Sequence, residues 1–419
     1  MTSAAPARRR PPFVLIALGL LAAAGLAIYA SDKGYYDRYF RLLYDLARTQ
    51  GQLERYDPVD PIRGADQPFP TAAPQSVGLA PDAIAQARAY AQANRSNAFL
   101  VWKDGALVEA SYWGVERETP IISRSLAKPW MSAAVGRALA LGYFNSLDQP
   151  VADFITEWKD DPQRSKILIR HLLDNRTGLL GQQPVFSPFE IRNRTYLHPE
   201  HERILIEEYP LLHPPGSRYD YSQANGDYVA IIFERASKRR YAEFLATELF
   251  QPIGAMGGSI WINRPDGVAH SGCCMQIPAE DFLRLGVLLL QDGVWNGRRL
   301  LPEGYVAEMT KGTAQNPYAG LSVYLAGPYI QRRGFANPDG TYRDTPTLHA
   351  EPYLAGDLFL FDGNNHQVVY VIPSANMVIL RTGRRPPKEP EWDNTILPNT
   401  LLRGLSRPED APPILPQKS

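Results

Sequence analysis

Residues 124–135 read Arg-Ser-Leu-Ala-Lys-Pro-Trp-Met-Ser-Ala-Ala-Val, which places Ser125 three positions before Lys128 at the start of an apolar segment. Apolar residues recur at helical spacing from Trp130 to Leu139, and this predicts a helix buried inside a domain. Pro129 is tolerated in a first helical turn, so we expect the helix to begin near Ser125. Positions i and i+3 share one helix face, so the lysine amine can reach the serine hydroxyl.

Ser125 is therefore interpreted as a nucleophile and Lys128 as its base. Burial lowers the pKa of a lysine, and a neutral lysine can act as a general base. The positive end of the helix dipole also favours an alkoxide or oxyanion at the serine. The alternative is a serine that caps the helix and a lysine whose charge reaches solvent. A Ser-x-x-Lys sequence also arises by chance, so the rest of the chain must decide.

Composition and charge bound the classes of protein to consider. The chain has 419 residues, of which 44% are hydrophobic, enough for one large domain with appendages or two average domains. It carries 44 basic and 44 acidic residues, so no overall field favours a nucleic-acid partner. We expect a globular protein that binds small molecules locally and does not bind nucleic acid.

The N-terminus carries a candidate membrane segment. Residues 13–30 are uncharged and apolar, and three arginines precede them at positions 8–10. This run is long enough to span a bilayer, and the arginines predict that residues 1–12 are cytoplasmic. We expect a single-pass anchor in the inner (cytoplasmic) membrane, a juxtamembrane helix and linker over 31–75, and a catalytic domain on the periplasmic side. A cleaved signal peptide is the alternative, because Ala30 and Ser31 are small.

The remaining pattern predicts an α+β domain over 76–384. Residues 98–102 and 106–113 are strand-like runs on either side of an Asp-Gly turn, and together they predict a β-hairpin. Residues 228–249 and 278–291 have helical spacing, whereas 357–361, 367–373 and 377–381 are strand-like. We expect one antiparallel sheet built from both chain ends and flanked by helices, with an all-helical region in the middle of the chain. The Pro-rich residues 385–419 predict an extended or disordered tail.

Two further features concern single residues. Tyr221 precedes a predicted helix, and a phenol beside a lysine can share its proton transfers. A core tyrosine with a satisfied hydroxyl is the alternative.

Cys273 and Cys274 are adjacent, and a disulfide between neighbours is strained and uncommon. We therefore expect two free, buried cysteines with a packing role, with a redox or metal pair as the alternative.

Taken in order, these motifs resemble the serine hydrolases related to class C β-lactamases and penicillin-binding proteins, which include esterases, D-aminopeptidases and nylon-oligomer (6-aminohexanoate-dimer) hydrolases. The first box is Ser125-x-x-Lys128, and Tyr221-Ser222-Gln223 stands where the family usually has Tyr-x-Asn. Stretches at 142–151, 167–179, 249–254 and 284–302 also resemble the family. The resemblance implies a β-lactamase/transpeptidase-like α/β sandwich, an acyl-enzyme on Ser125, and proton transfer by Lys128 and Tyr221. The substrate would be a small ester, amide or peptide-like molecule, and no cofactor is expected.

The sequence departs from the family at the second box. Gln223 replaces the usual asparagine, so hydrogen bonding to Lys128 or to a substrate is altered or is moved to Asn225.

The third box, normally Lys-Thr-Gly, is also missing as such. Its nearest equivalent by position is Phe361-Asp362-Gly363, whereas Arg381-Thr382-Gly383 imitates the box on the last strand and is treated as a decoy. The oxyanion hole is expected from backbone N–H groups of Ser125 and of the strand near Gly363 and Asn364. His366 is either an oxyanion donor or pH-sensitive contact, or a loop histidine without a catalytic role.

The missing third-box lysine affects the expected substrate. A substrate carboxylate left unpaired in a pocket is costly, so hydrolysis of an ester or simple amide is favoured over β-lactamase or D-Ala carboxypeptidase activity. A catalytically weak or inactive cell-envelope binding or sensor protein of the same fold is the alternative from another class.

Two other kinds of site are disfavoured by the sequence. No Gly-x-Ser-x-Gly elbow occurs. Residues 198–202, His-Pro-Glu-His-Glu, lack the His-Glu-x-x-His spacing of a zinc site, so no metal is expected.

Overall fold

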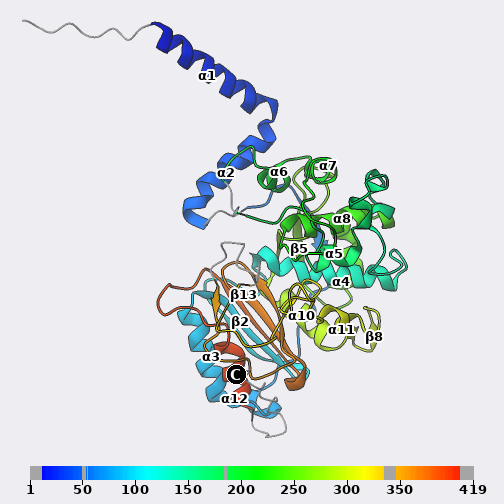
Figure 1. The fold of residues 1–419 in the computed structure, drawn as a ribbon. Coiled ribbons are helices and arrows are strands. Elements are labelled where there is room, and N and C mark those ends of the chain that lie inside the picture. The colour runs from blue at the N-terminus through cyan, green and yellow to red at the C-terminus, as the bar shows by residue number, and fades with distance from the viewer. Residues whose placement is uncertain (1–11, 50–52, 54, 184–185, 335–345, 406–419) are drawn as a thin grey trace, which may run out of the picture.

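The computed structural model describes residues 12–49, 53, 55–183, 186–334 and 346–405 (Figure 1). At its centre lies a six-stranded sheet in the order β3-β2-β14-β13-β12-β9, in which every neighbouring pair is antiparallel. The strands come from both ends of the domain: β2 (Ser96–Lys103), β3 (Ala106–Tyr112), β9 (Tyr324–Leu325), β12 (Phe359–Gly363), β13 (Gln367–Ile372) and β14 (Met377–Gly383). The predicted antiparallel sheet assembled from both chain ends is confirmed.

Helices cover both faces of this sheet (Figure 1). Successive side chains of β13 alternate between the two faces: Val369 and Val371 belong to the core on the side of α10 (Ala279–Leu290), whereas Tyr370 belongs to the core under α3 (Pro81–Ala93). Gly286 allows α10 to lie close to the sheet, because a Cβ there would be 2.7 Å from Val378 Cγ1. The sheet thus separates two hydrophobic cores and contributes side chains to both.

A largely helical region lies beyond α10 and carries the functional residues. Its main helices are α4 (Ala127–Ala140), α5 (Ile169–Leu173), α6 (Ile191–Leu197), α7 (His201–Glu207), α8 (Gln223–Ser237), α9 (Tyr241–Leu245) and α11 (Tyr305–Met309). A second antiparallel sheet, in the order β1-β5-β6-β4, joins β1 (Val59–Arg63), β5 (Gly257–Trp261), β6 (Met275–Pro278) and β4 (Pro120–Ile122). Two short ribbons pair β7 (Val294–Trp295) with β8 (Arg298–Arg299) and β10 (Arg332–Arg333) with β11 (Thr347–Leu348).

The N-terminal apolar segment is helix α1 (Pro12–Ser31), which projects away from the domain (Figure 1). Within the described residues, Phe13–Ser31 is the one helix long and apolar enough to cross a membrane, and none of it is buried. It indicates export or a membrane anchor.

The segment after the apolar helix is more ordered than expected. Helix α2 (Lys33–Thr49) packs against α6, and the buried Tyr35 and Tyr39 donate hydrogen bonds of 2.5 Å to the carbonyl oxygens of Pro188 and Phe186. These two tyrosines of the expected juxtamembrane helix therefore lie in the protein core. A buried tyrosine usually finds a hydrogen-bond partner for its hydroxyl, and both hydroxyls have one here.

Two expectations are wrong. The Pro-rich tail contains helix α12 (Ile396–Arg403), whose Leu397 and Leu401 are fully buried in the core under α3; Pro398 lies in its first turn, where proline is tolerated. Cys273 and Cys274 are buried as expected, but a disulfide joins them instead of leaving them free. The turn between β5 and β6 accommodates the bonded pair with Cys274 at a φ of +73°.

Candidate active site

Ser125 lies in a one-turn 3₁₀ helix, Arg124–Leu126, between β4 and α4. The preceding residue, Ser123, ties this turn to β6: its N–H donates to the Met275 carbonyl oxygen at 2.9 Å, and its Oγ accepts from the Met275 N–H at 3.0 Å. Arg124 has a φ of +53°, which is uncommon for a residue with a side chain. The serine is thus presented on a turn fixed by the neighbouring sheet, just before the predicted helix.

Lys128 lies in the first turn of α4 with only 6% of its surface exposed. Its Nζ donates to Gln223 Oε1 at 3.0 Å and to the Gly272 carbonyl oxygen at 2.8 Å. The same Nζ lies 4.8 Å from the centre of the Tyr221 ring. A buried amine is costly without such partners, and here two oxygens and an aromatic face supply them.

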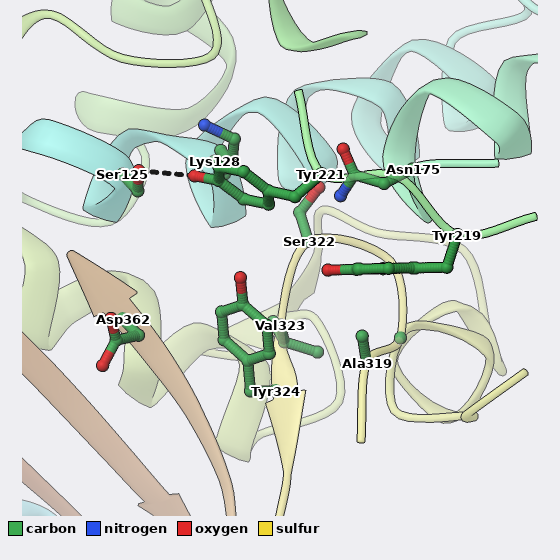
Figure 2. Close-up of a pocket in the computed structure, with 11 residues that line it drawn as sticks. Ser125, Lys128, Asn175, Tyr219, Tyr221, Ala319, Ser322, Val323, Tyr324 and Asp362 are labelled. Carbon is green, nitrogen blue, oxygen red and sulfur yellow. Dashed lines mark hydrogen bonds between the residues drawn. The ribbon is translucent and has the colours of Figure 1, made fainter. Parts of the chain in front are cut away.

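Tyr221 makes the contact with the serine. Its Oη lies 2.7 Å from Ser125 Oγ (Figure 2), and its carbonyl oxygen accepts from the Gln182 N–H at 2.8 Å. The residue sits two positions before α8, so the start of that helix and the 181–182 strand-like segment together fix the phenol. Ser125 and Lys128, predicted from one motif, and Tyr221, predicted from another, are therefore brought to one place.

A buried carboxylate stands behind the lysine. Asp227 Oδ1 accepts from Gln223 Nε2 at 3.2 Å and from the Gly272 N–H at 3.3 Å, and its Oδ2 lies 2.9 Å from His270 Nδ1. Asp227 thus holds both residues whose oxygens accept from Lys128. Our sequence reasoning missed it, although the spacing of Gln223 and Asp227, four positions apart on α8, is the available signal.

These groups line one cavity. Figure 2 shows Ser125, Lys128 and Tyr221 along one side and the segment around Tyr324 along the other. Asn175, Tyr219 and Tyr324 also line it and were not named from the sequence, whereas Asp362 lines it from the position expected for the third box. The segment 319–324 carries no motif, and only the folding of the chain brings it opposite the serine.

Comparison with known proteins identifies the family of this chain. The family model described as Beta-lactamase matches residues 81–396. This chain belongs to the Beta-lactamase family.

Individual relatives agree with the family. Over 96 residues the chain is 32% identical to a 6-aminohexanoate-dimer hydrolase of Paenarthrobacter ureafaciens, a match that covers 22% of this chain and 24% of that protein. The chain therefore aligns with about a quarter of that curated relative.

Solved structures share the fold at low identity. A candidate 6-aminohexanoate-dimer hydrolase from Bacillus anthracis superposes with a TM-score of 0.63 at 18% identity, covering 82% of this chain and 89% of the other. EstCE1, a hydrolase with promiscuous acyltransferase activity, superposes with a TM-score of 0.54 at 19% identity, covering 80% and 97%. A penicillin-binding protein homologue from Caulobacter crescentus gives 0.52 at 16% identity, covering 74% and 93%. The β-lactamase/transpeptidase-like fold expected from the sequence is confirmed.

The second box of this Beta-lactamase family member is built around Gln223 itself. Its side-chain oxygen accepts from Lys128, so the longer residue reaches the lysine without help from Asn225. Asn225 instead is buried, donates to Asn175 Oδ1 at 3.1 Å and accepts from Thr177 Oγ1 at 2.8 Å. The structure thus places Asn225 behind the cavity, where it braces Asn175.

At the third-box position, β12 ends beside the nucleophile. A Cβ on Gly363 would lie 3.2 Å from the Leu126 nitrogen and from the Ser123 carbonyl oxygen, so glycine permits this close approach. Asn364 follows in an exposed turn. The His366 ring stacks on Trp392 with 5.7 Å between ring centres, and burial lowers the pKa of His366 to about 4. The structure thus brings Gly363 to the serine and places Asn364 and His366 beyond it.

The Arg381-Thr382-Gly383 sequence lies in β14, away from the cavity. Arg381 is fully buried and donates to the carbonyl oxygens of Asn365 and His366 at 2.7 and 3.1 Å. Its guanidinium therefore secures the turn between β12 and β13.

Proposed function

We propose that this protein is an exported, membrane-anchored serine hydrolase that cleaves an ester or amide bond through an acyl-enzyme on Ser125. One observation carries the proposal: Ser125 Oγ and Tyr221 Oη are 2.7 Å apart at the mouth of the cavity, with the Lys128 amine 4.8 Å from the same phenol ring. A nucleophile in contact with a proton acceptor that is held by a third group is the general arrangement of covalent catalysis.

In the proposed reaction, Ser125 Oγ attacks the carbonyl carbon of the substrate while its proton passes to the phenolate form of Tyr221. The Lys128 ammonium balances the phenolate charge across the ring. The new C–O bond gives a tetrahedral intermediate; the bond to the leaving alcohol or amine then breaks, and Tyr221 returns the proton to that group. Water attacks the acyl-enzyme by the same route, and the carboxylic acid leaves with Ser125 restored.

The negative charge on the intermediate needs N–H donors. We assign them to the backbone of Ser125, at the start of α4, and to the end of β12 near Gly363. The close approach of Gly363 to the serine turn supports this assignment. Gly363→Ala would push the end of β12 away from the serine turn. We therefore expect the factor by which kcat falls to exceed the factor by which KM rises.

The lining of the cavity supports esters and simple amides over penicillins and D-alanyl peptides. Phe361-Asp362-Gly363 stands at the third-box position without a lysine, and Asp362 lines the cavity. A substrate carboxylate there would meet a like charge and not a cation.

We assign α1 as a single-pass anchor, with the catalytic domain on the periplasmic side of the inner membrane. The arginines at positions 8–10 and the 19-residue apolar span support this assignment. N-terminal sequencing of the membrane fraction tests it: an intact N-terminus is expected, and a new terminus near residue 31 would show a cleaved signal peptide instead.

Steady-state hydrolysis tests the activity. The full chain in detergent is assayed with p-nitrophenyl acetate and butyrate, acetyl p-nitroanilide and the β-lactam nitrocefin, beside Ser125→Ala. We expect turnover of the esters, slower turnover of the anilide, weak turnover of nitrocefin, and none by Ser125→Ala. Absence of turnover by the wild-type protein on all four would favour the binding or sensor alternative.

A further inference from the structure

The cavity of the proposed hydrolase is charged differently at its two ends. At one end, next to the serine, the Lys128 amine donates to two uncharged oxygen acceptors, Gln223 Oε1 and the Gly272 carbonyl oxygen. Asp362 lines the cavity from the end of β12, and Figure 2 shows it below Ser125, on the same side of the cavity as Tyr324. A substrate bound between Lys128 and Asp362 therefore has its reacting carbonyl near Ser125 at one end and faces a carboxylate at the other.

Three tyrosine rings complete the lining. Tyr219, Tyr221 and Tyr324 all face this cavity, and in Figure 2 the hydroxyl ends of Tyr219 and Tyr324 point into the same space below Ser125. Burial raises the pKa of Tyr219, and a hydrogen bond with Tyr324 opposes this rise without cancelling it. A neutral aromatic ring attracts a cation to its face, and a carboxylate beside such rings strengthens the preference.

A buried arginine, Arg333, lies near Asp362. Arg333 is 4% exposed, donates to the Ala326 carbonyl oxygen at 2.8 Å and lies 4.6 Å from the centre of the Tyr318 ring. Burial lowers the pKa of Arg333, and the charge of Asp362 is among the groups that raise it. A carboxylate has about four acceptor sites, so Asp362 can face this buried guanidinium and the cavity together. Arg333 thus contributes a positive charge near Asp362 and does not line the cavity itself.

We propose that Asp362, with Tyr219 and Tyr324, forms a subsite for a substrate ammonium group, so that the hydrolase prefers esters or amides that carry an amine or quaternary ammonium. This inference rests on the proposed function and adds the charge class of the substrate. It also reverses the preference for anionic substrates that a third-box lysine would confer.

Matched substrates test the subsite. The p-nitrophenyl esters of 4-(trimethylammonio)butanoate and 5,5-dimethylhexanoate have nearly the same shape but differ by one positive charge, and the ester of 4-sulfobutanoate carries a negative charge. We expect kcat/KM for the cationic ester to exceed that for the neutral one by about tenfold or more, and the anionic ester to be the poorest substrate.

Variants of Asp362 test whether this carboxylate causes the preference for the cationic ester. Asp362→Asn is expected to bring the cationic-to-neutral ratio close to one, and Asp362→Lys to favour the anionic ester. Asp82→Asn removes an exposed charge in the first turn of α3 and serves as control, with the wild-type ratio retained. A wild-type ratio near one, or a ratio that Asp362→Asn leaves unchanged, would overturn the proposal and show that Asp362 only pairs with Arg333.

Binding without turnover separates the two proposals. Isothermal titration of the Ser125→Ala protein compares the methyl amides of the same cationic and neutral acyl groups. Preferential binding of the cationic amide is expected even if the esters are not hydrolysed, in which case the proposed function fails and the subsite stands. Turnover of the neutral ester together with equal binding of both amides would refute the subsite alone.

Discussion

Tyr221→Phe removes one oxygen and leaves the rest of the site in place. The lost Oη is the atom 2.7 Å from Ser125 Oγ, whereas the ring that faces the Lys128 amine at 4.8 Å is kept. Loss of a positioned general acid–base group slows catalysis by about a hundredfold to ten-thousandfold, which is about 3–5 kcal/mol of transition-state stabilisation. The free energy of unfolding should fall by only about 1 kcal/mol, the typical value of one hydrogen bond.

The assay is the pre-steady-state burst of p-nitrophenolate from p-nitrophenyl acetate, which reports acylation of the serine directly. Tyr305→Phe is the matched control, because the Tyr305 hydroxyl also donates a 2.7 Å bond within the core, to the Ser132 carbonyl oxygen on α4. It should lose similar stability and keep its burst rate. If Tyr221→Phe acylates within threefold of wild type, the phenol is not the proton acceptor and the proposed route is wrong.

Three further changes test groups around the site. The pKa of His366 is about 4 in the folded protein and about 6.5 in the unfolded chain. Between these values the unfolded state binds more protons, so the free energy of unfolding falls as the pH drops from 6.5 to 4. Urea titrations should show a smaller fall for His366→Gln, and a fall of wild-type size in this variant would contradict the prediction. Asp227→Asn should lower kcat/KM about tenfold by loosening the partners of Lys128, with unchanged kinetics as the contrary result. Alkylation of the unfolded chain should reach Cys273 and Cys274 only after reduction, and labelling without a reductant would show free thiols.

The sheet could be predicted because its strands carry their own signals. The 98–113 hairpin has two strand-like, mostly apolar runs on either side of an Asp-Gly turn, and β2 and β3 are found there. The helix after Ser125 could be predicted because its apolar positions repeat at helical spacing, and α4 follows the serine directly. In both cases a local pattern determines the local structure.

What could not be predicted depends on contacts between distant segments. Tyr324 reaches the cavity because β9 and β12 are neighbours at the edge of the sheet, and it belongs to no recognisable motif. Asp362 lies at the third-box position, but its place beside Tyr324 depends on the same strand pairing. Asn225 has the right residue type and lies two positions after Gln223, but on α8 it points to Asn175 and not to Lys128. Helix α12 was hidden by the prolines around it, since composition says little about a short segment stabilised by tertiary packing.

The most direct test of the central claim is covalent labelling of the nucleophile. The full chain in detergent is treated with a fluorophosphonate, and intact mass and peptide fragmentation locate the adduct, with Ser125→Ala as control. We predict one adduct per chain, on Ser125, with none on the variant. An adduct on another residue, or an unlabelled wild-type protein, would contradict an activated Ser125 and with it the proposed hydrolase.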